Sequence, residues 1–167
     1  TNHRYKANEM RKQIDKGLEL LLIGLMALLV VDVLWQVLSR YVLASPSSFT
    51  DEVAGFLLIW VGLLGAAYVS GREEHLAIDL LLRQASEQGQ YRLKLIGYGC
   101  VCLFALAVLV GGGSWLVYTR FHLGVTSASL ALNLGYVYLA LPLSGLLTAY
   151  YALDSLFNMF NEQSKKK

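Results

Sequence analysis

Charged side chains are scarce in this sequence of 167 residues, where Asp, Glu, Lys and Arg together make up only 16%. Soluble domains carry about a quarter charged residues. Apolar residues reach 56%, and the mean hydropathy is +0.49. A soluble domain of this length has too little interior to enclose so much apolar surface, and a disordered chain would be far more polar. The composition therefore predicts an integral membrane protein with a single domain over residues 1–167.

Cysteine is also scarce, since Cys100 and Cys102 are the only two in the sequence. Two cysteines exclude a disulfide-rich secreted scaffold. Because residues two apart on a helix point in directions about 200° apart, this pair cannot hold a metal together. The net charge of +2 excludes an extended basic surface for nucleic acid. No Ser/His/Asp set, phosphate-binding loop or paired acid site is visible, so neither an enzyme nor a bound cofactor is expected.

Long apolar runs take the place of these features. A membrane-spanning helix needs about 20 mostly apolar residues. Four runs meet this requirement, at residues 17–43, 53–71, 95–119 and 134–153. Pro142 is expected to kink the fourth run, because proline lacks a backbone N–H and crowds the preceding turn. The predicted fold class is an all-α integral membrane protein with four transmembrane helices, since a soluble domain would lack the polar sequence to coat them.

Lysine and arginine are distributed unevenly among the segments that flank the four spans. Twelve of the fourteen lie in the N-terminal tail, in the segment between spans two and three, and at the C-terminus. Only Arg40 and Arg120 lie in the other two connections. Because cytoplasmic segments are enriched in these residues, both termini are predicted to be cytoplasmic. The first span is expected to be retained, because no small-residue cleavage pattern follows its apolar run.

The segment between spans two and three contains a short apolar stretch, residues 76–82, bracketed by acidic and basic residues. This stretch is too short to cross a bilayer but long enough to lie in its interface. We therefore expect a short amphipathic helix at about residues 74–84 on the membrane surface. A plain extension of the second span beyond the membrane is the alternative.

The first span contains a polar face made by Asp32, Gln36, Ser39 and Arg40, which share one side of a helix at their spacing. An ionisable group inside a span costs a few kcal/mol and normally faces protein or water. One hypothesis makes Asp32 a proton or cation site. The other, which the sequence favours because no second acid lies near the middle of another span, makes this face a contact with another protein.

The start of the second span carries two acids, Asp51 and Glu52, directly after Thr50. Thr50 is a plausible helix N-cap, and acids in a first turn are stabilised by the helix dipole. Arg40 should lie at the same membrane face, so an ion pair between Arg40 and Glu52 is expected. Trp60, in the middle of this span, is expected to pack against a protein partner or lipid tails.

His75 is the one histidine that could serve as a metal or haem ligand. His3 lies in the tail and His122 at the opposite membrane face, so neither is placed to be a second axial ligand. Small residues in the spans, including Gly62, Gly65 and the Gly111–Gly113 run, are expected to let helices approach closely.

Several short motifs follow one another along the chain. Ser39-Arg40-Tyr41 closes the first span, Phe49-Thr50-Asp51-Glu52 opens the second, Trp60 and Gly65-Ala66 follow, and Arg72-Glu73-Glu74-His75-Leu76-Ala77-Ile78-Asp79 ends the series. A weaker echo is Ser129-Leu130-Ala131-Leu132 followed by Tyr138-Leu139-Ala140-Leu141-Pro142. In this order the chain resembles the small membrane subunit of tripartite ATP-independent periplasmic (TRAP) transporters, the DctQ-like family. The departures are Phe49, Asp51 and Asn133, where that family commonly has Trp, Glu and Pro.

The resemblance implies a non-catalytic subunit of a sodium-driven importer of an organic acid, such as a dicarboxylate or sialic acid. It implies a stable pair with a large, elevator-type membrane subunit and transient contact with a periplasmic binding protein. The bilayer would be that of a bacterial inner membrane. The periplasmic loops, about residues 44–50 and 121–133, could help to dock the binding protein. The residues proposed for structural and partner contacts are Asp32, Gln36, Arg40, Asp51, Glu52, Trp60, Arg72, His75 and Asp79.

Two other function classes stay open at this point. An autonomous small multidrug-type transporter would use Asp32 or Glu19 as its proton-coupling acid, although such proteins lack a long middle segment. A cytochrome-like or quinone-binding subunit would be coloured or redox active. Solute uptake by the chain without a large partner would favour the autonomous transporter.

Overall fold

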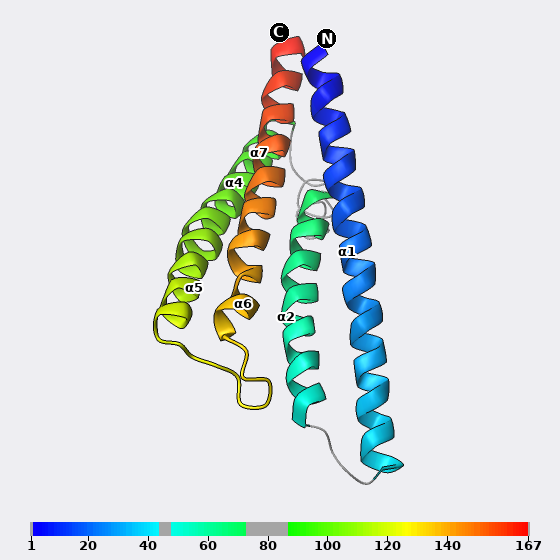
Figure 1. Cartoon of the computed structure of the whole chain (residues 1–167). Coiled ribbons are helices and arrows are strands. Elements are labelled where there is room, and N and C mark those ends of the chain that lie inside the picture. The colour runs from blue at the N-terminus through cyan, green and yellow to red at the C-terminus, as the bar shows by residue number, and fades with distance from the viewer. Residues whose placement is uncertain (1, 44–47, 73–86, 167) are drawn as a thin grey trace.

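The chain folds as a set of long helices (Figure 1). The computed structural model describes residues 2–43, 48–72 and 87–166. The elements are α1 (Asn2–Tyr41), α2 (Ser48–Gly71), α4 (Glu87–Phe104), the π-helix η1 (Ala105–Gly112), α5 (Gly113–His122), α6 (Leu134–Tyr138) and α7 (Ala140–Lys166). The expected interfacial helix at 74–84 lies outside the described residues.

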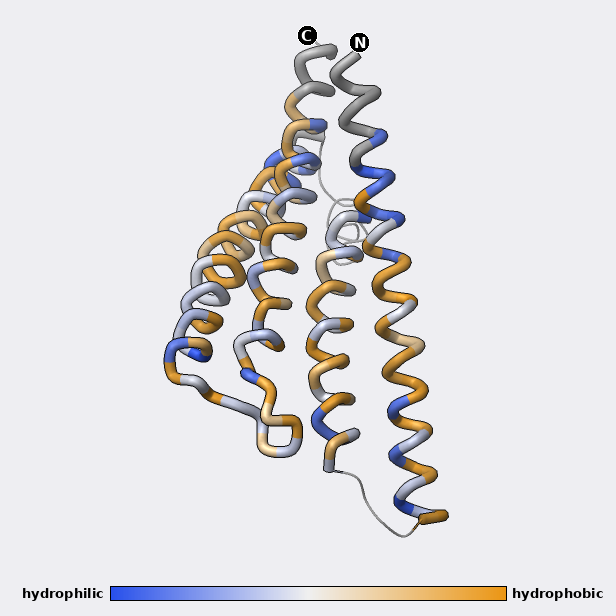
Figure 2. The backbone as a smooth tube through the Cα atoms, in the orientation of Figure 1, coloured by the Kyte–Doolittle hydropathy of each residue, from blue (hydrophilic) through white to orange (hydrophobic). Residues whose placement is uncertain are grey.

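Four helical stretches are long and apolar enough to cross a membrane: Arg11–Tyr41, Ser48–Gly71, Gly89–His122 and Leu134–Phe160. This finding confirms the all-helical fold with four spans. The shortest stretch has 24 residues, so at 1.5 Å per residue it covers about 36 Å, more than the roughly 30 Å hydrocarbon core. Figure 2 shows apolar residues along the middle of the helices, with hydrophilic residues gathered toward their ends. The cytoplasmic placement of the termini stays a prediction.

The helices form an open row rather than a closed bundle. Among the described residues, α1 packs on α2, α2 on α7, and α7 on the continuous helix made by α4, η1 and α5 (Figure 1). In the most apolar part of the fourth span, Leu134–Phe160, 39% of the residues are buried, whereas in that of the first span, Arg11–Tyr41, only 6% are buried. α7 is therefore the central helix, and α1 and the α4–α5 helix form the two outer edges of the row.

Glycines set the close approach between α7 and the neighbouring η1 and α5. A Cβ atom built on Gly113 would lie 2.9 Å from the Leu141 side chain, and one on Gly145 would lie 2.6 Å from Leu109. The prediction of close packing is therefore confirmed at Gly113. It is wrong for Gly62 and Gly65 among the described residues, where their Cβ positions meet open space because α1 and α7 cover other sides of α2.

Pro142 acts at the expected place in the fourth span. The helix is interrupted at Leu139, between α6 and α7. Proline at 142 cannot donate to the carbonyl of Tyr138, four residues earlier, and its ring crowds that carbonyl. Tyr138 is the last residue of α6. The missing hydrogen bond therefore coincides with the break in the helix.

Candidate functional site: two polar ends of the helix row

Polar side chains tie three helices together at the end of the row that holds both termini. Arg11 donates one hydrogen bond to Asp154, over 2.6 Å, and another to the carbonyl of Gly71. The hydroxyl of Tyr151 donates to Asp15 over 2.6 Å. We call these five residues the terminal cluster. Because α1, α2 and α7 each contribute, the cluster fixes the relative positions of three helices at this end.

Tyr151 is the packing centre of the terminal cluster. Its side chain is 1% exposed, and a Cβ atom on Gly71 would lie 2.8 Å from its ring. The guanidinium of Arg11 lies 5.9 Å from the centre of the same ring, within the range of a cation–π interaction. The glycine at 71 thus makes room for the buried tyrosine, whose one polar atom is satisfied by Asp15.

A second polar contact lies beside the terminal cluster. Tyr68 donates to Glu19 over 3.4 Å and accepts a hydrogen bond from Arg72. Arg72, one of the proposed contact residues, is exposed and also lies over the Tyr68 ring at 4.7 Å. Glu19 therefore has a partner in the chain, and Arg72, the residue after the last of α2, turns its guanidinium back onto Tyr68. His75 and Asp79 lie outside the described residues.

Asp32 lies at the base of a groove at the opposite end of the row. The groove has a volume of about 430 Å³ and an apolar lining: Leu28, Val31, Trp35, Phe49, Thr50, Val53 and Leu57 accompany the acid. One carboxylate oxygen of Asp32 is buried and has no hydrogen-bond partner among the described residues. Asp32 is therefore beside the first turn of α2 and not in the middle of the helix row, because α1 continues beyond the start of α2.

The rest of the predicted polar face of α1 divides between buried and exposed positions. Ser39 is 4% exposed and donates to the carbonyl of Gln36 over 3.0 Å. Gln36 is half-buried, whereas Arg40 is exposed and forms no ion pair within the described part of the chain. The expected Arg40–Glu52 ion pair is not present, because Glu52 uses both of its carboxylate oxygens elsewhere.

Glu52 binds the loop between α5 and α6. Its two carboxylate oxygens accept hydrogen bonds from the backbone amides of Ser129, over 3.0 Å, and Leu130, over 3.1 Å. The hydroxyl of Ser127, in the same loop, is buried and has no hydrogen-bond partner among the described residues. The neighbouring Asp51 is exposed. Glu52 thus anchors a loop that is distant in the sequence, which residue spacing alone could not reveal.

The loop that Glu52 anchors, residues 123–133, has its own internal bonds. Its backbone forms an antiparallel bridge between Thr126 and Asn133. Asn133 caps α6 by accepting from the amide of Gly135 over 2.8 Å. Gly124 and Ala131 adopt positive φ angles of 61° and 52°. Since Ala131 is not a glycine, its left-handed backbone indicates a shape held by surrounding bonds.

One face of α2 is open and rich in small residues. Gly55, Gly62 and Ala66 are exposed, and so are Leu58 and Val69 on the same side of the helix. Within the described parts of the chain, no neighbouring atom lies within 4 Å of a Cβ atom built on Gly55 or Gly62. Trp60 is only half-buried. Small residues on a membrane helix permit close approach of another backbone, so this face is suited to a further helix.

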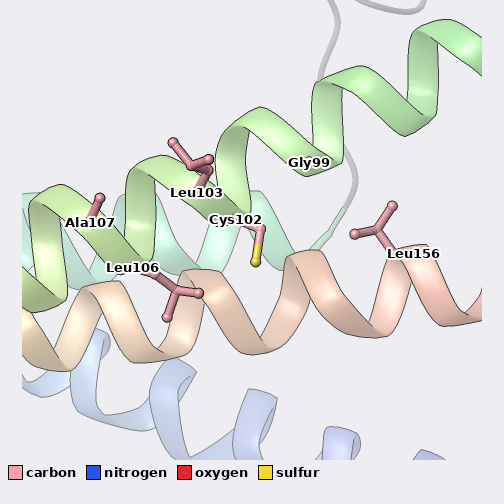
Figure 3. Close-up of a pocket in the computed structure, with 6 residues that line it drawn as sticks. All are labelled: Gly99, Cys102, Leu103, Leu106, Ala107 and Leu156. Atoms are coloured by element: carbon pink, nitrogen blue, oxygen red, sulfur yellow. The ribbon is translucent and has the colours of Figure 1, made fainter.

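A shallow apolar groove lies on the other side of the molecule, between α7 and the α4–η1 helix (Figure 3). Its volume is about 540 Å³, and its lining is Gly99, Cys102, Leu103, Leu106, Ala107 and Leu156. Cys102 is free, as is the exposed Cys100. The described residues contain no cluster of His, Cys, Asp or Glu arranged for a metal ion. The lining of the groove is mainly apolar, which suits contact with lipid tails.

These features define a class before they define a family: a small multi-pass membrane protein whose polar groups join helices and hold a loop. The sequence profile of the DctQ component of tripartite ATP-independent periplasmic transporters matches residues 26–162. The match covers most of the chain, and the chain belongs to this family.

Individual relatives agree with this assignment. The chain is 26% identical over 154 residues to the sialic acid TRAP transporter small permease protein SiaQ of Vibrio cholerae, covering 90% of this chain and 85% of that protein. It is 28% identical over 109 residues to the C4-dicarboxylate TRAP transporter small permease protein DctQ of Rhodobacter capsulatus, covering 65% of this chain and 48% of that protein. It is therefore a component of a TRAP transporter.

A different kind of relative is the sialic acid TRAP transporter permease protein SiaT of Haemophilus influenzae. It is 33% identical to this chain over 73 residues, which are 41% of this chain but only 12% of that protein. A segment similar to the small subunit thus occurs within a much longer permease.

Proposed function

We propose that this chain braces the large membrane subunit of a sodium-driven TRAP transporter that imports an organic acid. In this function the chain carries no substrate itself. The elevator-type large subunit moves substrate and sodium across the membrane. Its moving part needs an immobile scaffold that does not tilt with it. Four rigid spans supply such a frame and widen the footprint of the complex in the bilayer.

The open helix row is the observation that carries this proposal. A transport pathway needs polar groups from several helices that converge on an enclosed space. In the described residues, α1 packs along α2, meets α7 only through side chains of the terminal cluster, and is not reached by the α4–α5 helix. The terminal cluster joins helices at one end only. The alternative of an autonomous transporter that uses Asp32 gains no support, because Asp32 lies at an apolar groove near the other end of the row.

The large subunit is proposed to bind across α1 and α2. The open face of α2 at Gly55, Gly62 and Ala66 would accept one of its helices closely. The groove at Asp32 would accept a cationic side chain, since an acid in an apolar setting is stabilised by an opposite charge. The match within the longer SiaT permease supports a pairing of the small subunit with a large one, because a segment similar to this chain occurs there within one longer polypeptide.

The proposed setting is a bacterial inner membrane with both termini in the cytoplasm. The loop end of the row then faces the periplasm, where a binding protein would deliver substrate. Relatives named for sialic acid and for C4-dicarboxylates support an organic acid as the substrate class.

The proposal is tested by expressing the chain alone, the large subunit of its own system alone, and the two together. All three samples are reconstituted in liposomes with the loaded binding protein and a sodium gradient. We expect the two membrane subunits to purify as a stable pair and uptake of the organic acid to require that pair. Full uptake by the large subunit alone, or failure of the subunits to purify together, would overturn the proposal.

A further inference from the structure

Glu52 and the loop at residues 123–133 form one unit at the end of the row away from the termini. The acid lies in the first turns of α2, and the loop amides that it binds lie 77 and 78 residues later in the sequence. We propose that Glu52 is a positioning residue, which holds this loop in the shape that docks the soluble binding protein. This inference rests on the proposed function.

The hydrogen bonds show why a carboxylate is suited to position 52. Two neighbouring backbone amides, those of Ser129 and Leu130, point to the same group, and a carboxylate offers one oxygen to each. Bonds to an ionised acceptor are about twice as strong as neutral ones. The anchor therefore opposes the loss of conformational freedom that ordering an eleven-residue loop requires.

Further bonds within the loop complete its shape. Ser127 donates its amide to the carbonyl of Leu132 over 2.8 Å, and Ala131 donates to Ser127 over 3.2 Å. The loop is joined to α5 as well, because the amide of Val125 donates to Arg120 over 3.2 Å. Glu52 adds the tie to α2, so the loop is held from two helices.

The anchored loop presents an uncharged surface. Residues 121–133 contain no Asp, Glu, Lys or Arg, and the exposed side chains at its tip are Ala128, Ser129, Ala131 and Leu132. Small neutral side chains fit an uncharged surface on the partner, where shape matters more than steering by charge. A loop already in its bound shape spares the cost of ordering it on each encounter, which raises affinity.

The test compares Glu52→Ala with Glu9→Ala, which makes the same change at an exposed acid of α1 at the opposite end of the row. Each variant is reconstituted with the large subunit, and uptake is measured against binding-protein concentration. Glu52→Ala is expected to raise the half-saturating concentration about tenfold, the effect of losing one or two charge-assisted hydrogen bonds, with maximal uptake within about twofold. Glu52→Gln should recover part of the loss, because its one carbonyl oxygen can accept one amide. Glu9→Ala should match the parent.

Loop order is measured in the same complexes with a spin label at Ala128→Cys, after Cys100 and Cys102 are replaced by alanine. The label should become more mobile in Glu52→Ala and remain restricted in Glu9→Ala. An unchanged label in Glu52→Ala would overturn the anchor. A mobile label with an unchanged half-saturating concentration would overturn the docking role while leaving the brace intact. Loss of the subunit pair in the parent protein would instead contradict the proposed function.

Discussion

At the end of the row that holds both termini, polar side chains find partners within the chain. Arg11 binds Asp154, and Tyr151 binds Asp15. At the opposite end, among the described residues, Asp32 has a buried oxygen without a hydrogen-bond partner and Arg40 is exposed without an ion pair. Glu52 is the acid there that is bound within the chain, and its partner is a loop. One end is thus closed by the protein itself, whereas the other offers unused polar groups. This difference is what a subunit with its external contacts at one end would show.

The largest expected loss of unfolding free energy is at the closed end, in the variant Tyr151→Ala. This change empties the space that Gly71 and α1 leave for a side chain that is 1% exposed. Truncation of a buried aromatic costs about 3–5 kcal/mol of unfolding free energy. Unfolding of the purified chain in detergent should show this loss, and Tyr150→Ala, at the less buried neighbour, should cost clearly less. Equal losses for the two tyrosines would contradict the central place of Tyr151.

A smaller loss is expected from Arg11→Ala, which removes the ion pair to Asp154 and leaves the Gly71 carbonyl unpaired. The two charged side chains are 25% and 26% exposed, so the cost should be about 1–3 kcal/mol. Lys12→Ala is the matched control, since Lys12 is 76% exposed and its Glu9 contact is 4.0 Å long. The same unfolding measurement applies, and an Arg11 variant as stable as the control would show that the cluster does not join the helices.

At the open end, a substitution should weaken binding of the large subunit while leaving the stability of the isolated chain almost unchanged. Asp32→Asn is expected to leave the stability of the isolated chain within about 0.5 kcal/mol, because it breaks no hydrogen bond within the described residues. The same change should shorten the lifetime of the pair with the large subunit by about tenfold, as loss of a charged contact would. Dissociation of labelled subunits in nanodiscs measures this effect. An unchanged lifetime would remove Asp32 from the interface.

The smallest effect on the isolated chain is expected from Gly62→Leu. A side chain at Gly62 meets open space, so the unfolding free energy should change by less than about 0.5 kcal/mol. In the pair, the added bulk should separate the approaching helices and weaken co-purification. Gly145→Leu serves as the contrast, because a Cβ at Gly145 would lie 2.6 Å from Leu109 and the isolated chain itself should be destabilised. A pair unaffected by Gly62→Leu would contradict docking on this face.

The sequence was sufficient for the number and type of the spans, because apolar length determines whether a helix can cross a bilayer. It also placed the break near Pro142, since the loss of one N–H acts locally. It could not place Asp32 beside the start of α2, because the offset between two helices depends on their packing. The Glu52 anchor and the Arg11–Asp154 pair were missed for the same reason, since they join residues 77 or more apart. The only advance signal in the sequence was the presence of acids directly beside the span ends, as at Glu52 and Asp154.

The central claim is that this chain supports a transporter and does not transport. The most direct measurement is uptake of a labelled organic acid into liposomes that contain the purified chain alone, under both sodium and proton gradients. The account predicts no uptake above empty liposomes, with uptake appearing when the large subunit and the loaded binding protein are added. Solute accumulation by the chain alone, abolished by Asp32→Asn, would contradict it.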